Sequence, residues 1–277
     1  MPGRVALIDA DLLAYRAAFK GETNIDWNGD GNVTTDTNMD VVIAAVDALV
    51  TEWRGLVKCT GVRLVQSDPQ RRSFRKQYVW GGYKRQRKET AKPKLLKQAE
   101  AYIADKYDAT SHPGLEGDDV MGLLTTTHPD KYVIVSTDKD MLTVPGRVCI
   151  VGRTPDRTRK FNLSETDANL KWMRQVIIGD PADNYLGAPG LGEAKALLYV
   201  APGSLEEMWR GVVDAYITAW NERPRFRDRW VHPGAPAEEA LMTARLARVL
   251  RNGDKDGNKV RLWSAPGEEE TWVTLVS

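Results

Sequence analysis

Short apolar runs and longer stretches with helical spacing alternate along the first 166 residues. The short runs predict buried strands at residues 4–9, 62–66, 132–136 and 148–151. Apolar positions that recur on one helical face predict helices at residues 11–19, 39–56, 93–107 and 120–127. Strands that alternate with helices in this way favour a mainly parallel α/β sheet flanked by helices.

The pattern changes after about residue 167. Helical spacing dominates there, at residues 170–178, 193–200, 205–221 and 237–250, followed by expected strands at 259–263 and 271–276. Earlier in the chain, Asn-Gly and Asp-Gly pairs within residues 25–34 indicate a hairpin or a loop. We therefore expect an α/β domain at residues 1–166 and a helical part at 167–277, packed together because no linker separates them.

The composition narrows the choice of metal and compartment. Apolar residues make up 42% and charged residues 28% of the 277 residues, as in ordinary globular proteins. No run of 18 apolar residues and no signal-peptide pattern occur, so we expect a cytoplasmic protein without a membrane span. Two cysteines and three histidines are too few for a disulfide framework or a Cys-based zinc site, so any metal should be held by carboxylates. That favours Mg²⁺ or Mn²⁺.

Carboxylates follow the ends of the predicted strands. Asp9, Asp68 and the pair Asp138 and Asp140 each lie just past a strand, and Glu116-Gly-Asp118-Asp119 precedes a helix. A single aspartate at a strand end is usually a helix cap or a solvated loop residue. Parallel sheets, however, bind ligands beyond the carboxyl ends of their strands, so these acids are expected to meet. Clustered carboxylates repel unless a cation neutralises them, and two Mg²⁺ ions about 4 Å apart could activate water for phosphodiester hydrolysis.

One segment is strongly basic, although the net charge of the chain is only +1. Between residues 71 and 97 a single acid, Glu89, stands against Arg71, Arg72, Arg75, Lys76, Lys84, Arg85, Arg87, Lys88, Lys92, Lys94 and Lys97. A basic surface beside an acidic pocket suits a polyanionic substrate and a metal that cuts it.

A glycine-rich segment follows a second pair of acids. Asp180 and Asp183 precede Gly187, Gly190, Gly192 and Lys195, with the spacing of a helix–hairpin–helix. Backbone N–H groups of such a hairpin hold a DNA phosphate. The alternative is a structural corner in which glycine supplies left-handed backbone angles and nothing binds. The two acids immediately upstream favour the functional interpretation.

Five motifs together resemble the flap endonuclease/5′→3′ exonuclease family, most of all its short bacteriophage exonucleases. They occur in the family's order: Leu7-Ile-Asp9, Tyr83-Lys84-x-x-Arg87, Glu116-Gly-Asp118-Asp119, Ser136-Thr-Asp138-Lys-Asp140, and Gly179-Asp180-x-x-Asp183-Asn184 with Gly190-Leu-Gly192. The resemblance covers about residues 4–200. It implies a PIN-like nuclease domain with an arch, short here at about residues 70–97, and a helix-three-turn-helix at about 179–200.

The resemblance also implies roles for individual residues. Asp9, Asp68, Glu116, Asp118 and Asp119 would hold or surround one metal ion, and Asp138, Asp140, Asp180 and Asp183 would serve a second. Lys84 and Arg87 would contact the scissile phosphate, Tyr83 would stack on the terminal base, and the hairpin at 187–192 could bind K⁺. The expected DNA contacts are Arg71, Arg72, Arg75, Lys76, Arg85, Gly187, Gly190, Gly192 and Lys195.

These motifs imply a monomeric metal-dependent 5′→3′ exonuclease or flap endonuclease, active in phage DNA replication or degradation. Its substrate would be duplex DNA with a 5′ end or 5′ flap, or an RNA–DNA hybrid. A rival enzyme is a haloacid-dehalogenase-like phosphatase with Asp9 as nucleophile and Asp11 as acid/base. That class needs Gly117-Asp118-Asp119 at the end of an apolar strand, which the sequence does not provide. The non-enzyme rival is a DNA-binding relative that has lost its chemistry, although no expected acid is missing.

Overall fold

A mainly parallel five-stranded sheet forms the centre of the first half of the protein. The computed structural model describes residues 3–26, 33–86 and 91–276. The strands lie in the order β4 (Gly61–Val65), β1 (Val5–Asp9), β5 (Tyr132–Ser136), β6 (Gly146–Ile150) and β7 (Arg159–Leu163). All neighbours are parallel except β7, which runs antiparallel to β6. The predicted sheet is thus confirmed, with β7 as an additional edge strand.

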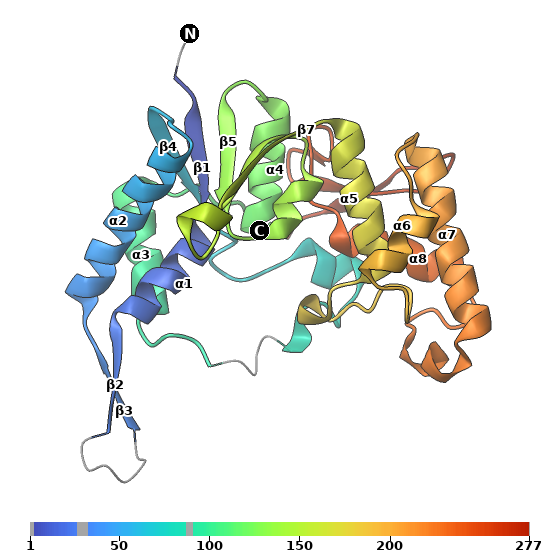
Figure 1. Cartoon of the computed structure of the whole chain (residues 1–277), viewed down its shortest axis with the longest axis horizontal. Coiled ribbons are helices and arrows are strands. Elements are labelled where there is room, and N and C mark those ends of the chain that lie inside the picture. The colour runs from blue at the N-terminus through green and yellow to red at the C-terminus, as the bar shows by residue number, and fades with distance from the viewer. Residues whose placement is uncertain (1–2, 27–32, 87–90, 277) are drawn as a thin grey trace.

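Helices cover both faces of this sheet, because the alternating side chains of β1 place apolar residues on each face and these residues are buried beneath the helices. Ala6 and Ile8 pack toward a core shared with α1 (Ala10–Lys20), α2 (Met39–Leu56) and α3 (Leu96–Tyr107). Leu7 points to the opposite core, which α4 (Gly117–Thr127) covers. Figure 1 shows α1, α2 and α3 together on one side of the strands.

The second half is helical up to residue 247. The helices α5 (Glu165–Ile178), α6 (Glu193–Tyr199), α7 (Leu205–Glu222) and α8 (Pro236–Ala247) enclose a separate core. The chain then forms a small sheet of β8 (Lys255–Asp256), β9 (Lys259–Leu262) and β10 (Thr271–Thr274). Val260 and Leu262 of β9 belong to the core beneath α4, so the end of the chain packs back on the central sheet. The division at residue 166 remains a prediction.

Two connections complete the fold. The antiparallel pair β2 (Glu22–Asp26) and β3 (Val33–Thr37) confirms the expected hairpin, which projects from the body (Figure 1). Residues 66–86, which include the first part of the basic segment, leave β4, pass through the π-helix η1 (Arg75–Val79), and run from the sheet to the helical half. Short 3-10 turns fill the remaining links: η3 (Lys139–Thr143), η4 (Pro155–Arg157), η5 (Pro181–Asp183) and η6 (Pro224–Arg229). Within the described ranges, no helix is both long and apolar enough to cross a membrane.

Candidate active site

The carboxyl ends of two neighbouring strands bring the first acids together. Asp9 ends β1 and caps α1, with Oδ1 accepting a hydrogen bond from the Leu12 N–H at 3.1 Å. The hydroxyl of Ser136, the last residue of β5, lies 3.4 Å from Asp9 Oδ2 and also accepts from the Asp138 N–H. Burial, and then the charges of Asp11 and Asp138, raise the pKa of Asp9 to about 7. Ser136 was not among the expected site residues, although it lies within one of the quoted motifs.

The first turn of α4 supplies a second set of acids. In the part of the chain that the structure describes, Glu116, Asp118 and Asp119 are the one group of three whose ligand atoms all lie within 4.8 Å of one another. Burial and the neighbouring charge of Glu116 raise the pKa of Asp118 well above its usual range. Burial opposes the charge of Glu116 too, but Lys84 and Arg75 outweigh it and lower its pKa to about 2. Asp118 is therefore the member of this group whose charge most needs a cation.

A third set of acids comes from η3 and η5. Burial and then Asp138 raise the pKa of Asp140 to about 6, and Asp180 and Asp183 act in the same direction. Asp180 caps η5 by accepting from the Ala182 N–H at 2.8 Å. These acids are coupled by charge, but they do not form the compact arrangement found at α4.

Tyr83 and Lys84 connect the second set of acids, at α4, with the third set, at η5. The Tyr83 hydroxyl lies 3.1 Å from Glu116 Oε2 and 3.2 Å from Asp183 Oδ2, so it bridges α4 and η5. The Lys84 ammonium group pairs with Glu116 and lies 3.6 Å from Asp183 Oδ2. Tyr83 was expected to stack on a terminal base, but here its side chain is only 4% exposed and Lys84 Nζ lies over its ring. Arg87 lies outside the described residues.

Arg75 is also placed differently from the expectation. It was expected to contact DNA, but it is 2% exposed. Its guanidinium forks onto Asp119 at 2.6 and 2.7 Å, reaches Glu116 at 2.9 Å, and donates to the carbonyls of Leu246 and Arg248. Arg75 is therefore the internal counter-ion of the α4 acids and is not part of a DNA surface.

The acid Asp68 is tied into its own loop. Its carboxylate pairs with Arg72 at 2.6 Å and accepts from the Gly114 N–H at 2.8 Å, and hydrogen bonding from Arg72 lowers its pKa against the effect of burial. The structure thus does not join Asp68 to the other acids. Arg71 pairs with Asp11 and Glu100 beside the site. Asp11, considered only for the phosphatase, lies here as well, with Oδ2 accepting from the Ser67 N–H at 2.9 Å.

Two expected DNA contacts, Lys76 and Arg85, are exposed.

The phosphatase alternative needs Gly117-Asp118-Asp119 at the end of a strand. In the structure these residues begin the helix α4 instead, so the geometry that this alternative needs is absent.

Two glycines of the glycine segment, Gly187 and Gly192, differ in their surroundings. Gly187 has φ +64°, and a Cβ there would lie 2.4 Å from the Gly179 N atom, so this glycine is required by close backbone packing. Gly192 has open space around its Cβ position, and Lys195 Nζ donates to the Gly190 carbonyl at 3.3 Å. The segment is fixed to the basic loop, because Asn184 Nδ2 donates to the Gly82 carbonyl at 2.8 Å.

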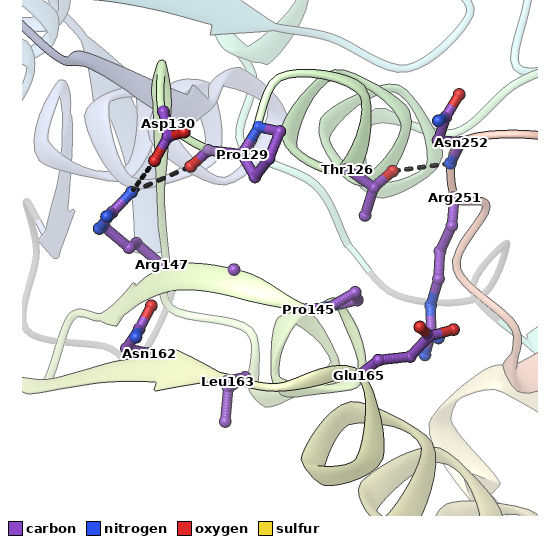
Figure 2. Close-up of a pocket in the computed structure, with 11 residues that line it drawn as sticks. Thr126, Pro129, Asp130, Pro145, Arg147, Asn162, Leu163, Glu165, Arg251 and Asn252 are labelled. Carbon is purple, nitrogen blue, oxygen red and sulfur yellow. Dashed lines mark hydrogen bonds and ion pairs between the residues drawn. The ribbon is translucent and has the colours of Figure 1, made fainter.

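A separate hollow of about 460 Å³ lies at the opposite end of the sheet (Figure 2). It is lined by the end of α4 at Thr126 and by Gly146 and Arg147 at the start of β6. Arg147 donates to the Pro129 carbonyl at 3.0 Å and pairs with Asp130 at 3.8 Å. The hollow is therefore remote from the carboxyl ends of the strands, where the acids gather.

Comparisons with known proteins agree with this geometry. Residues 4–170 match the model of the 5′-3′ exonuclease, N-terminal resolvase-like domain. An exodeoxyribonuclease of Enterobacteria phage T3 is 25% identical over 86% of this chain and 78% of its own length. An exonuclease of Escherichia phage T7 is 26% identical over 68% of this chain and 64% of its own length.

A solved structure supports the fold. The bacteriophage T5 flap endonuclease, in a complex with DNA and metal ions, aligns with 87% of this chain and 99% of its own, at 15% identity and a TM-score of 0.50. This likeness confirms the expected PIN-like architecture. Since the family model covers more than half of the residues, the chain belongs to the 5′-3′ exonuclease family.

Proposed function

We propose that this nuclease hydrolyses DNA phosphodiester bonds from or near a 5′ end, as an exonuclease or flap endonuclease that depends on Mg²⁺ or Mn²⁺. One observation carries the proposal. Acids at the end of β1, just after β5, at the start of α4 and in η5 gather at the carboxyl ends of the strands, and two basic-loop side chains, Tyr83 and Lys84, contact the acids Glu116 and Asp183. The names of the phage relatives supply the substrate class.

The donor set fits a hard divalent cation. All candidate ligands are carboxylates, and Asp9, Asp118 and Asp140 have raised pKa values, so their ionised forms are unfavourable without a compensating charge. We assign the first ion to Glu116 and Asp118, with Asp9 nearby. Asp119 would lie beside this ion without binding it, because both of its carboxylate oxygens accept hydrogen bonds from Arg75. The second ion is assigned to the acids of η3 and η5, together with Asp138.

Bound divalent ions would polarise the scissile phosphate and supply hydroxide at neutral pH. Lys84 would move from Glu116 to the phosphate and stabilise the charge that develops on its oxygens. Arg75 and Tyr83 hold Glu116 in place during this exchange. Exposed Lys76, Arg85 and Lys195, with the glycine segment, would hold the DNA backbone.

The proposal extends to four further points taken from the sequence. The hairpin at residues 187–192 would bind K⁺ through backbone carbonyls, RNA–DNA hybrids would serve as alternative substrates, and the protein would act as a monomer in the host cytoplasm.

A cleavage assay tests the proposal. Duplex DNA labelled at the 5′ or the 3′ end, a 5′-flapped duplex and a closed circle are incubated with Mg²⁺ or with EDTA. We expect metal-dependent release of 5′ label, no cutting of the circle, and loss of cleavage in Asp118→Asn. The matched control is Asp130→Asn, since the Asp130 side chain is 99% exposed and far from the acids. Cleavage that survives EDTA, or DNA binding without cleavage, would overturn the proposal.

A further inference from the structure

An arginine-rich turn lies against the glycine segment and has no role in the site described above. Residues 223–229 read Arg-Pro-Arg-Phe-Arg-Asp-Arg and form the link from α7 through η6. Within residues 3–26, 33–86 and 91–276, no ion pair involves Arg223, Arg225, Arg227 or Arg229. The turn thus carries four positive charges against one acid of its own, Asp228, and a second, Glu222, immediately before it.

The turn is docked on the glycine segment through Arg223. A Cβ at Gly190 would lie 2.5 Å from Arg223 Nη1 and 2.7 Å from Cζ, so the guanidinium lies directly on the glycine backbone. Its Nε atom is buried there without a hydrogen-bond partner. Gly190 has φ +75°, and its carbonyl accepts from Lys195 Nζ at 3.3 Å. Two cations from separate elements therefore flank one glycine.

Aromatic rings hold the other arginines in place. Arg225 and Arg229 lie over the Phe226 ring at 4.8 and 5.3 Å, and Arg227 lies over the Trp220 ring at 4.6 Å. A guanidinium that stacks on a ring can still donate from its edge N–H groups, and this edge matches a phosphate. Arg227 uses its Nε–H in a hydrogen bond to the Trp220 carbonyl at 2.9 Å, so a phosphate contact there would fall to its Nη groups.

We propose that residues 223–229, together with Lys195, form a second phosphate-binding surface that holds the backbone of duplex DNA beside the glycine segment. This inference rests on the proposed DNA-cleaving function. The contacts are to phosphates and not to base edges, so the surface binds without regard to sequence and depends strongly on salt. It gives the region after residue 200, which the family motifs do not explain, a part in substrate binding.

The test compares duplex binding by the parent protein and by Arg225→Gln/Arg229→Gln, in EDTA to prevent cleavage. Both side chains are exposed, so the variant is expected to keep its fold and melting temperature. The matched control, Arg54→Gln/Lys58→Gln, removes the same charge from exposed positions in the last turn of α2 and just after it, at the opposite end of the sheet. Affinity is measured by fluorescence anisotropy between about 50 and 200 mM salt, the range over which phosphate contacts are lost.

We expect the η6 variant to bind duplex at least about tenfold more weakly at the higher salt, with the slope of log Kd against log salt reduced by roughly one for each arginine removed. KM should rise while kcat at saturating DNA stays unchanged, and the control should match the parent. An unchanged salt slope in a parent that binds and cuts duplex would overturn the surface alone. A parent that neither binds nor cuts DNA would overturn the proposed function instead. If the double variant melts early, Arg229→Gln is measured in its place, with an expected slope change of about one.

Discussion

Replacing Tyr83 with phenylalanine separates two roles for this residue. The ring is retained, so a stacking role would be preserved, and only the hydroxyl that contacts Glu116 at 3.1 Å and Asp183 at 3.2 Å is lost. Burial and the charge of Glu116 raise the pKa of Tyr83 well above its usual range, so this hydroxyl keeps its proton throughout the working pH range. The variant therefore removes one donor shared by two acids.

The size of the effect follows from that single donor. One O–H group can donate one hydrogen bond at a time, and a hydrogen bond to a charged group contributes about 1.5–3 kcal/mol. If the acids are positioned for catalysis by this bond, kcat should fall by roughly 10- to 100-fold, since about 1.4 kcal/mol corresponds to a factor of ten. KM for DNA should change little, because Tyr83 is buried and does not face the substrate.

The assay is steady-state cleavage of a 5′-labelled duplex in saturating Mg²⁺, with Tyr83→Ala measured alongside. The bridging role predicts that both variants lose turnover. Full activity in Tyr83→Phe, with loss only in Tyr83→Ala, would refute the bridging role and support the alternative that the ring stacks on a base.

Three further predictions follow. Arg75→Met leaves the fully buried Asp119 unpaired, so it should lower stability by about 3–5 kcal/mol; weaker DNA binding at an unchanged melting temperature would contradict the internal counter-ion role. The pKa of Asp9 rises from 3.8 to about 7, so the metal-free fold retains a proton that the unfolded chain releases and loses stability as the pH rises toward 7. A divalent ion replaces that proton, so Mg²⁺ should raise the melting temperature more at pH 8 than at pH 5.5, and the difference should shrink in Asp9→Asn; equal shifts at both pH values would exclude this linkage. Lys84→Gln should reduce kcat more than DNA affinity, and a pure affinity defect in a gel-shift measurement would argue against its contact with the scissile phosphate.

The sheet and most of its acids could be predicted because local rules govern them. Asp9 and Asp138 lie at the ends of neighbouring parallel strands, and the parallel topology alone places those ends at one edge. The strand β7 was missed because most of its residues are exposed and only two of its five residues, Phe161 and Leu163, are apolar, which is too short an alternation to predict a strand.

Individual side-chain partners could not be predicted in the same way. Arg75 lies in a basic run and resembles its exposed neighbours, but its burial depends on carbonyls of Leu246 and Arg248, more than 170 positions along the chain. Asp68 follows a strand like the other acids, but Arg72, four residues later, takes its carboxylate. Charge and strand position therefore predicted where acids would gather, whereas the partner of each charged side chain depended on loop geometry at Asp68 and on long-range packing at Arg75.

The central claim is that acids from distant segments form one divalent-metal site. Crystals soaked in Mn²⁺ test it most directly, because anomalous scattering locates each ion. The account predicts an ion against Glu116 and Asp118 and a second one beside Asp138, Asp140 and the acids of η5. A map with no anomalous peak among these carboxylates, from crystals of protein that binds DNA, would contradict it.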